Sequence, residues 1–498
     1  MTTETPSQSA APAPIENRTR LGNAKLRFDD QAFELRTIRV DGQRVHVRAF
    51  ENIVYVANPV DSTYQSMNIY VPEAYFSNRN VGIYTAETAP IFLPNQVGGY
   101  MPAEPGKLDQ SARPPARMAE RPNTIAKALA RGYVVASPGA RGRTTQNAAG
   151  QYNGKAPAAI VDLKAAVRYL RYNDGRIPGD AGKIISNGTS AGGALSALLG
   201  ASGNHDDYDD ELQALGAAPA PDNIFAVSAY CPITNLEHAD SAYEWMFNGV
   251  NDYKKIDISM LDYQMHRREV AGTLTSAQIQ TSDALKPLFP TYVNSLGLKG
   301  THGEVLQLDA NGNGSFKDAV KAHVIASAQT ALDTGTDLSQ LNWLNVQQGR
   351  VVDMDWDAYV RHAGRMKLPP AFDGLDLSTG ENQLFGSAAV DKQHFTDFSQ
   401  RNSTVANAGR ADAQTVKMMN AMNYIDARGA VPAQHWRIRH GTKDRDTSLA
   451  IPVILATTLQ NRGYAVDFAL PWDRPHSGDY DLDDLFAWMD SLNASGGQ

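Results

Sequence analysis

A serine between glycines gives the first chemical signal, in the run Gly188-Thr189-Ser190-Ala191-Gly192. The run has the G-x-S-x-G pattern; an apolar, strand-like segment precedes it and a segment of small residues typical of a helix follows it. A serine on such a strand–turn–helix elbow stands at the carboxyl edge of a sheet, where it can attack a carbonyl carbon. The alternative is a glycine-rich turn whose serine only caps a helix. The flanking elements favour Ser190 as a nucleophile.

A serine hydroxyl needs a base, and the fold that uses this elbow supplies acid and base later in the chain, on loops after late strands. Among 11 histidines, His476 directly follows the last predicted strand and precedes the predicted terminal helix. We therefore predict His476 as the base. The loop after the preceding strand holds two carboxylates, Asp444 and Asp446. Spacing does not decide between them, but Asp444 lies nearer the strand and is favoured as the triad acid.

Two segments could stabilise a developing oxyanion with backbone N–H groups. Ala191 begins the helix after the serine, where free N–H groups point at the site. Gly98 and Gly99 follow another predicted strand, and adjacent glycines permit close backbone approach. We expect one of these two glycines to be the second donor, with an ordinary glycine turn as the alternative.

The elements that must position these residues read as an α/β fold. Alternating apolar residues between positions 35 and 71 predict an antiparallel entry to a sheet. Strand, helix and strand then alternate, which is the signature of a mostly parallel, doubly wound sheet. Thr447 is a plausible cap for one of the helices, and Gly463 a plausible stop. The predicted buried strands cover 90–93, 133–136, 183–186, 225–230, 436–438 and 466–470, and the clearest helices cover 122–131, 160–172 and 448–460.

The alternation of predicted strands and helices stops between residues 235 and 422. We interpret this region as a cap inserted between two strands of the main sheet. The core then comprises 31–234 and 423–498. Residues 1–30 are predicted to be a flexible tail, because the first 17 are mostly Thr, Ser, Ala, Pro and Gln.

Composition excludes several classes of protein. The formal net charge of −8 and the lack of a sustained basic face argue against nucleic acid as a partner. No apolar stretch approaches the ~20 residues of a membrane span, and the first residues do not read as a signal peptide. We expect a soluble protein without a membrane partner, in an undetermined compartment. Cys231, the single cysteine, can form no internal disulfide.

Residues 309–315 match the first half of a calcium-binding loop, with oxygen ligands at its first, third and fifth positions and a glycine at its sixth. The bidentate glutamate expected at the twelfth position is Val320. We therefore favour a surface turn over a calcium site and expect no metal.

With the elbow and both loops in place, the chain resembles the bacterial tannases over about residues 37–493. Its most specific matches are the segments 94–101, 188–193, 439–446 and 475–481. The resemblance implies an α/β-hydrolase core with a large cap, and Ser190, Asp444 and His476 as the triad. It also implies that Lys367, Glu381 and Asp446 bind the phenolic hydroxyls of a galloyl ring. Spacing alone does not single out Lys367 or Glu381.

We therefore expect a serine esterase that releases gallic acid from galloyl esters of tannins and simple gallates without a cofactor. Its partners would be small phenolic esters. An esterase of the same fold for feruloyl or other hydroxycinnamoyl esters is the nearest alternative, and a serine peptidase is a more distant one.

Overall fold

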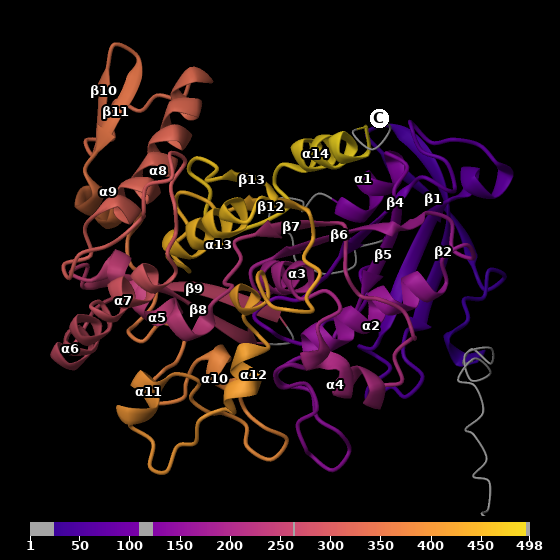
Figure 1. Cartoon of the computed structure of the whole chain (residues 1–498), viewed down its shortest axis with the longest axis horizontal. Helices are drawn as coiled ribbons and strands as arrows, with labels where there is room; N and C mark the ends of the chain where they lie inside the picture. The colour runs from indigo at the N-terminus through magenta and orange to yellow at the C-terminus, as the bar shows by residue number, and fades with distance from the viewer. Residues whose placement is uncertain (1–23, 109–122, 262–263, 495–498) are drawn as a thin grey trace, which may run out of the picture.

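A nine-stranded sheet forms the centre of the computed structural model, which describes residues 24–108, 123–261 and 264–494 (Figure 1). The strand order is β1-β2-β3-β5-β4-β6-β7-β12-β13. Strands β1 to β3 are antiparallel, and every neighbouring pair from β5 to β13 is parallel. The strands are β1 (Glu34–Val40), β2 (Gln43–Val54), β3 (Ser66–Pro72), β4 (Pro90–Pro94), β5 (Val134–Pro138), β6 (Asp180–Thr189), β7 (Ala226–Tyr230), β12 (His435–Arg439) and β13 (Ala465–Ala469). The predicted α/β fold class is confirmed, with a strand at each of the six predicted buried runs.

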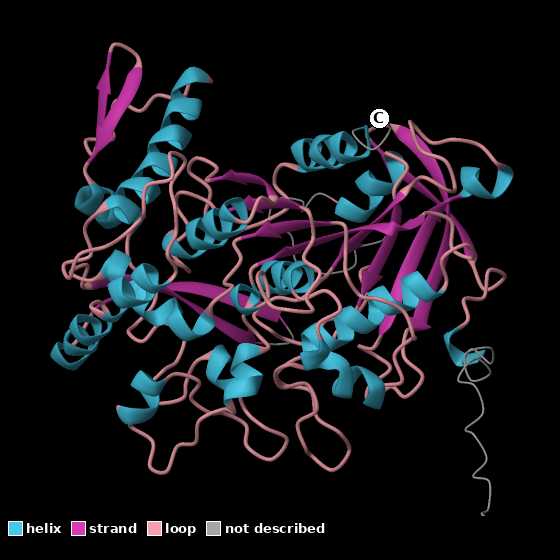
Figure 2. Cartoon of the chain, viewed as in Figure 1, coloured by secondary structure: helices cyan, strands magenta, loops and turns pink. Residues whose placement is uncertain are grey.

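Helices cover both faces of the sheet, as Figure 2 shows, and this explains why β4, β5 and β7 are buried throughout. In Figure 1, α1 lies on one side of the sheet and α2, α3 and α13 lie on the other, as the rule of right-handed crossovers predicts. The terminal helix α14 lies with α1, where Arg131 pairs with Asp490 at 3.5 Å. The helices are α1 (Thr124–Ala130), α2 (Ala158–Tyr172), α3 (Ala191–Ala201), α4 (Asp209–Ala214), α13 (Ala450–Asn461) and α14 (Leu482–Ala494).

Two local predictions differ from the structure. Thr447 does not cap α13, which begins after Leu449, and the Thr447 hydroxyl has no hydrogen-bond partner among the described residues. Gly463 does adopt a left-handed conformation (φ 82°) just after the helix ends. Residues 1–23 of the predicted tail lie outside the described residues, but Leu26 and Phe28 are buried, so the packed chain begins earlier than expected. The Phe28 N–H donates to Asn173 Oδ1 of the core at 2.9 Å.

Residues 231–434, here called the insertion, leave the sheet after β7 and return at β12. The insertion carries two small ribbons and eight α-helices within its described part. Most of its buried apolar residues join the core in one continuous cluster, and Ala328, Leu338 and Val351 form a small second cluster. Whether a separate cap begins at 235 and ends at 422 stays a prediction. The elements are α5 (Leu236–Phe247), β8 (Asp252–Leu261), β9 (Gln264–Thr273), α6 (Ser276–Leu285), α7 (Leu288–Ser295), α8 (Ser315–Asp333), β10 (Leu344–Gln347), β11 (Arg350–Met354), α9 (Trp356–Ala363), α10 (Gly380–Leu384), α11 (Asp397–Arg401) and α12 (Ala413–Lys417).

The loop with the partial calcium pattern is a hydrogen-bonded turn. The Asp309 carboxylate accepts the N–H groups of Asn311 and Asn313, each at 2.9 Å. The Gly312 carbonyl accepts the indole N–H of Trp245 at 2.9 Å, which ties the turn to α5. In the described ranges, no helix is both long and apolar enough to cross a membrane.

Candidate active site

Ser190 lies in the turn between β6 and α3, at the carboxyl edge of the sheet. Its backbone is left-handed (φ 61°, ψ −124°), a conformation that costs a non-glycine residue free energy and lifts its side chain out of the turn. The flanking glycines are required by close contacts. A Cβ on Gly188 would lie 2.2 Å from the Gly192 carbonyl oxygen, and one on Gly192 would lie 2.5 Å from Asn95 Oδ1. These contacts explain the pattern of small residues around Ser190.

The structure brings the three predicted triad residues together from three loops. His476 Nε2 lies 2.8 Å from Ser190 Oγ, and His476 Nδ1 lies 2.7 Å from Asp444 Oδ2. Asp444 is fully buried, whereas His476 keeps 24% of its side chain exposed. A buried acid, a half-buried base and an accessible serine in this order match a serine hydrolase triad.

The histidine loop is held against the nucleophile strand by tight packing. A Cβ on Gly478 would lie 1.8 Å from Thr189 Oγ1, so only glycine allows this approach. Asn187 Nδ2 donates to Asp479 Oδ1 at 3.0 Å, which joins β6 to the same loop. Both contacts fix the position of His476 beside Ser190.

Charge coupling between His476 and Asp444 favours the ionised form of each. Burial alone would lower the pKa of His476, but the Asp444 and Asp446 carboxylates outweigh it and hold that pKa above its ordinary value. Burial would raise the pKa of Asp444, but His476 and His440 outweigh it and hold that pKa well below its ordinary range. Asp444 therefore stays a carboxylate that can orient the imidazole.

Two buried residues, His440 and Cys231, lie beside the triad, and the sequence analysis did not predict this position for either of them. His440 Nε2 lies 3.6 Å from Asp444 Oδ2, and neither ring nitrogen of His440 has a hydrogen-bond partner among the described residues. The Cys231 thiol donates to the Ser477 carbonyl at 3.2 Å, and burial raises the pKa of this thiol to about 11. Cys231 is therefore neutral and packs beside the triad as a small apolar group.

Asp446, the competing carboxylate, pairs with a residue of the insertion. Its carboxylate pairs with Lys367 Nζ at 3.2 Å, and both side chains are about one-fifth exposed. Lys367 Nζ also lies 3.8 Å from the centre of the Phe372 ring. The two carboxylates thus have different partners, which supports the choice of Asp444 as the triad acid.

Glu381, at the start of α10, lies within electrostatic range of this pair. Burial raises the pKa of Glu381, Lys367 opposes the rise, and Asp446 adds to it. The structure therefore brings Lys367, Glu381 and Asp446 together, although 65 residues or more separate Asp446 from the other two. Arg143 joins the group from the core, because its charge also acts on Glu381 and its Nε donates to the Gly99 carbonyl at 2.9 Å.

The predicted oxyanion donors lie on two adjoining segments. Ala191 is the first residue of α3, and Asn95 ties the loop after β4 to that helix by donating to the Gly192 carbonyl at 3.0 Å. Gly99 has a left-handed backbone (φ 56°). A Cβ on Gly98 or Gly99 would meet nothing within 4 Å, so protein packing does not require either glycine to approach a neighbour closely. The roles of Ala191, Gly98 and Gly99 stay predictions.

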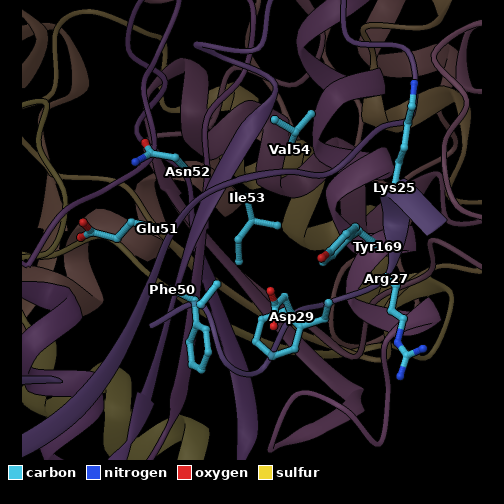
Figure 3. Close-up of a pocket in the computed structure, with 11 residues that line it drawn as sticks. Lys25, Arg27, Asp29, Phe50, Glu51, Asn52, Ile53, Val54 and Tyr169 are labelled. Atoms are coloured by element: carbon cyan, nitrogen blue, oxygen red, sulfur yellow. The ribbon is translucent and has the colours of Figure 1, made fainter. Parts of the chain in front are cut away.

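A hollow at the antiparallel end of the sheet, away from the triad, contains none of the predicted site residues (Figure 3). It measures about 280 Å³ and is lined by β2, by the chain preceding β1 and by Tyr169 of α2. Lys25, Arg27 and Asp29 rim it. Because no nucleophile and base converge there, the triad remains the site of interest.

A nucleophile elbow with an adjoining histidine and a buried aspartate, on a mostly parallel sheet, defines a serine hydrolase of the α/β-hydrolase class. Comparisons with known proteins narrow this class. The family model BD-FAE matches residues 113–289. None of the curated proteins matches the chain.

Solved structures match it closely. A tannin acyl hydrolase from Lactobacillus plantarum shares 50% identity and a TM-score of 0.88, covering 94% of this chain and 99% of that one. A tannase from Fusobacterium nucleatum shares 51% identity and a TM-score of 0.88 over 94% and 99%. A tannin acyl hydrolase in complex with ethyl gallate shares 49% identity and a TM-score of 0.87 over 96% and 100%. The chain belongs to the tannase family and is a carboxylic ester hydrolase.

Proposed function

We propose that this protein hydrolyses galloyl esters and releases gallic acid, with Ser190, His476 and Asp444 as its catalytic triad. The observation that carries the proposal is the ion pair between Lys367 of the insertion and Asp446, because Asp446 lies on the same loop as the triad acid. A relative of 49% identity has been solved with ethyl gallate, an ester of this class. Feruloyl esters and peptides, the alternatives from the sequence, have no comparable support.

The reaction proceeds in two acyl-transfer steps. Ser190 Oγ attacks the ester carbonyl carbon while His476 Nε2 takes the hydroxyl proton, and backbone N–H groups receive the negative charge on the carbonyl oxygen. Collapse of the tetrahedral intermediate breaks the bond to the alcohol, which leaves with the proton from His476. Water, deprotonated by His476, then attacks the acyl carbon; the bond to Ser190 Oγ breaks, Oγ regains the proton from His476, and the acid leaves. Asp444 holds the imidazole in the required tautomer and stabilises its charged form.

Recognition of the acyl ring rests on Lys367, Glu381 and Asp446. Carboxylates accept hydrogen bonds from phenolic O–H groups, and an ammonium donates to a phenolic oxygen. A ring without hydroxyls covers these charged groups and leaves part of their hydrogen-bonding capacity unused, so it binds poorly. The specificity is therefore for the acyl portion of the ester.

The test compares methyl gallate hydrolysis by the wild type, Ser190→Ala and a matched control, Ser477→Ala. Ser477 lies beside His476, and its exposed hydroxyl donates to the Pro475 carbonyl at 3.0 Å. We expect Ser190→Ala to lose at least about 10⁴-fold in kcat and Ser477→Ala to remain within a few fold of the wild type. Retained turnover in Ser190→Ala would refute the assignment of the nucleophile. A wild type that prefers methyl ferulate to methyl gallate would refute the substrate class.

A further inference from the structure

A single buried hydroxyl joins the triad loop to the segment that carries Lys367. Tyr243 lies on α5 and is completely buried. Its phenolic O–H donates to the Arg445 carbonyl at 2.9 Å. The same oxygen accepts the N–H groups of Met366 at 3.1 Å and Lys367 at 3.0 Å. The hydroxyl thus uses its one donor and both of its lone pairs.

The three hydrogen bonds connect the two halves of the proposed ring-hydroxyl site. Arg445 stands between Asp444 and Asp446, and Lys367 supplies the ammonium that pairs with Asp446. Long side chains in a partly exposed ion pair gain little by themselves, because their attraction is screened and their freedom is lost on pairing. The backbone of Lys367 therefore needs its own anchor if the ammonium is to be held where a substrate hydroxyl would bind.

The next residue on α5 holds the other side of the same backbone. Glu244 forms a completely buried ion pair with Arg365, and Arg365 Nη1 donates to the Lys367 carbonyl at 3.1 Å. The N–H of Lys367 is bound by Tyr243 and its C=O by Arg365. Consecutive residues of one helix thus fix Lys367 from both sides.

The ring of Tyr243 supports the same arrangement by packing. It lies edge-on to Phe372, with centroids 6.4 Å apart, and Phe372 is the ring beneath Lys367 Nζ. Phe247 packs on the ring of Tyr243 at 4.7 Å. Loss of the hydroxyl alone would leave this packing intact and release the N–H groups of Met366 and Lys367 and the carbonyl of Arg445.

We propose that Tyr243 is a positioning residue that couples recognition of the ring hydroxyls to the triad, by setting the separation of Lys367 from the Asp444–Asp446 loop. The inference rests on the proposed function of Lys367 and Asp446. Asp444 itself is held independently, because its Oδ1 accepts the Asp446 N–H at 2.9 Å and its own N–H donates to the Gly441 carbonyl at 3.0 Å. Removing the Tyr243 hydroxyl should therefore weaken ring recognition more than the chemical step.

The experiment uses Tyr243→Phe in the full chain and measures kcat/KM for methyl gallate and for methyl benzoate, which lacks the hydroxyls. We expect the gallate-to-benzoate ratio to fall about 10-fold, chiefly through KM for methyl gallate. Tyr359→Phe is the matched control. Tyr359 is also a buried tyrosine of the insertion, and its hydroxyl donates to the Thr442 carbonyl of the same loop at 2.6 Å, but it does not bind the Lys367 segment. The ratio should stay unchanged in Tyr359→Phe.

A purely structural role would lower the yield or stability of Tyr243→Phe without changing the ratio, and that result would overturn the inference. In a Lys367→Ala background the hydroxyl should have nothing left to position, so adding Tyr243→Phe should not change the ratio further.

Should Tyr243→Phe not fold, difluorotyrosine at position 243 keeps the ring and the O–H while weakening the oxygen as an acceptor. An unchanged ratio in that protein would also overturn the inference. A wild type without preference for methyl gallate would refute the proposed function itself, whereas an undiminished gallate-to-benzoate ratio in Tyr243→Phe would refute only the role of Tyr243.

Discussion

Asp444 and Asp446 lie two residues apart on one loop and point to different partners. The Asp444 carboxylate contacts His476 Nδ1 at 2.7 Å, and the Asp446 carboxylate contacts Lys367 Nζ at 3.2 Å. The Asp446 N–H also donates to Asp444 Oδ1 at 2.9 Å. One short loop therefore carries both the proposed triad acid and the proposed acceptor for a ring hydroxyl, only two residues apart.

The substitution Asp444→Asn should preserve the shape of the site and remove most of the hydrolytic activity. The amide can donate to His476 Nδ1, which holds the imidazole in the wrong tautomer and removes the charge that stabilises the imidazolium. We expect kcat to fall by about 10⁴-fold for methyl gallate and for methyl benzoate alike. Steady-state kinetics with both esters checks this. A loss confined to methyl gallate would show that Asp444 serves ring recognition instead.

Asp446→Asn should affect the two esters unequally, in contrast to Asp444→Asn. The substitution removes the Asp446 carboxylate, a charged acceptor for a phenolic O–H, while the triad keeps its contacts. The value of kcat/KM for methyl gallate should therefore fall roughly 10- to 100-fold relative to methyl benzoate. The gallate-to-benzoate ratio is the measurement. An equal loss on both esters would place Asp446 in the chemical step.

The pH profile should report the raised pKa of His476. The imidazole must be neutral to accept the Ser190 proton, so kcat/KM should rise with pH through a pKa above the ordinary value of 6.5. Asp446→Asn removes one of the carboxylates that raise this pKa and should move the rising limb to lower pH, measured with methyl benzoate. Asp473→Asn is the control, because that exposed carboxylate pairs with Lys443 at 2.5 Å. A limb unmoved by Asp446→Asn would contradict the assignment.

Acid should destabilise the protein partly through His238. Burial lowers the pKa of His238 to about 4, and its ring stacks on Tyr292 at 3.6 Å. The folded state therefore resists a proton that the unfolded state accepts at a pKa near 6.5, so stability is lost as pH falls from about 6.5 towards 4. The free energy of unfolding should fall by up to about 3 kcal/mol from this group. His238→Phe keeps an aromatic ring and should flatten the loss between pH 7 and pH 5 in urea unfolding; an unaltered slope would rule His238 out.

The two kinds of glycine near the site should respond differently to alanine. A Cβ at 188 would clash with the Gly192 carbonyl and displace Ser190, so Gly188→Ala should lose at least about 100-fold in kcat/KM. A Cβ at 98 would meet nothing within 4 Å, so Gly98→Ala should change the free energy of unfolding by no more than about 0.5 kcal/mol. Thermal unfolding and methyl gallate kinetics on both variants test the contrast.

Local patterns predicted the sheet because its strands are short apolar runs, buried on both faces and bounded by turns. The same reasoning placed Ser190 and His476 on loops that meet at one sheet edge. It failed at Thr447, since a serine or threonine before a helix caps it only if the helix begins where expected. It also did not find Tyr243, whose contacts join segments more than 100 residues apart and leave no trace in sequence spacing.

The residues proposed to bind the ring hydroxyls were the hardest to predict from the sequence. Lys367 and Glu381 look like ordinary charged residues in a polar stretch, and only the family resemblance singled them out. Spacing could not choose between Asp444 and Asp446, because both lie on the same turn. The choice depends on which carboxylate meets His476, and that is set by hydrogen bonds within the folded loop, where the Asp444 N–H donates to the Gly441 carbonyl and Asp444 Oδ1 accepts the Asp446 N–H.

A crystal structure of Ser190→Ala soaked with methyl gallate tests the central claim most directly. The account predicts that the ester carbonyl lies beside residue 190 and His476, with the ring hydroxyls in hydrogen-bond contact with Lys367, Glu381 and Asp446. A ring bound elsewhere, or with its hydroxyls turned away from Lys367 and Asp446, would contradict it.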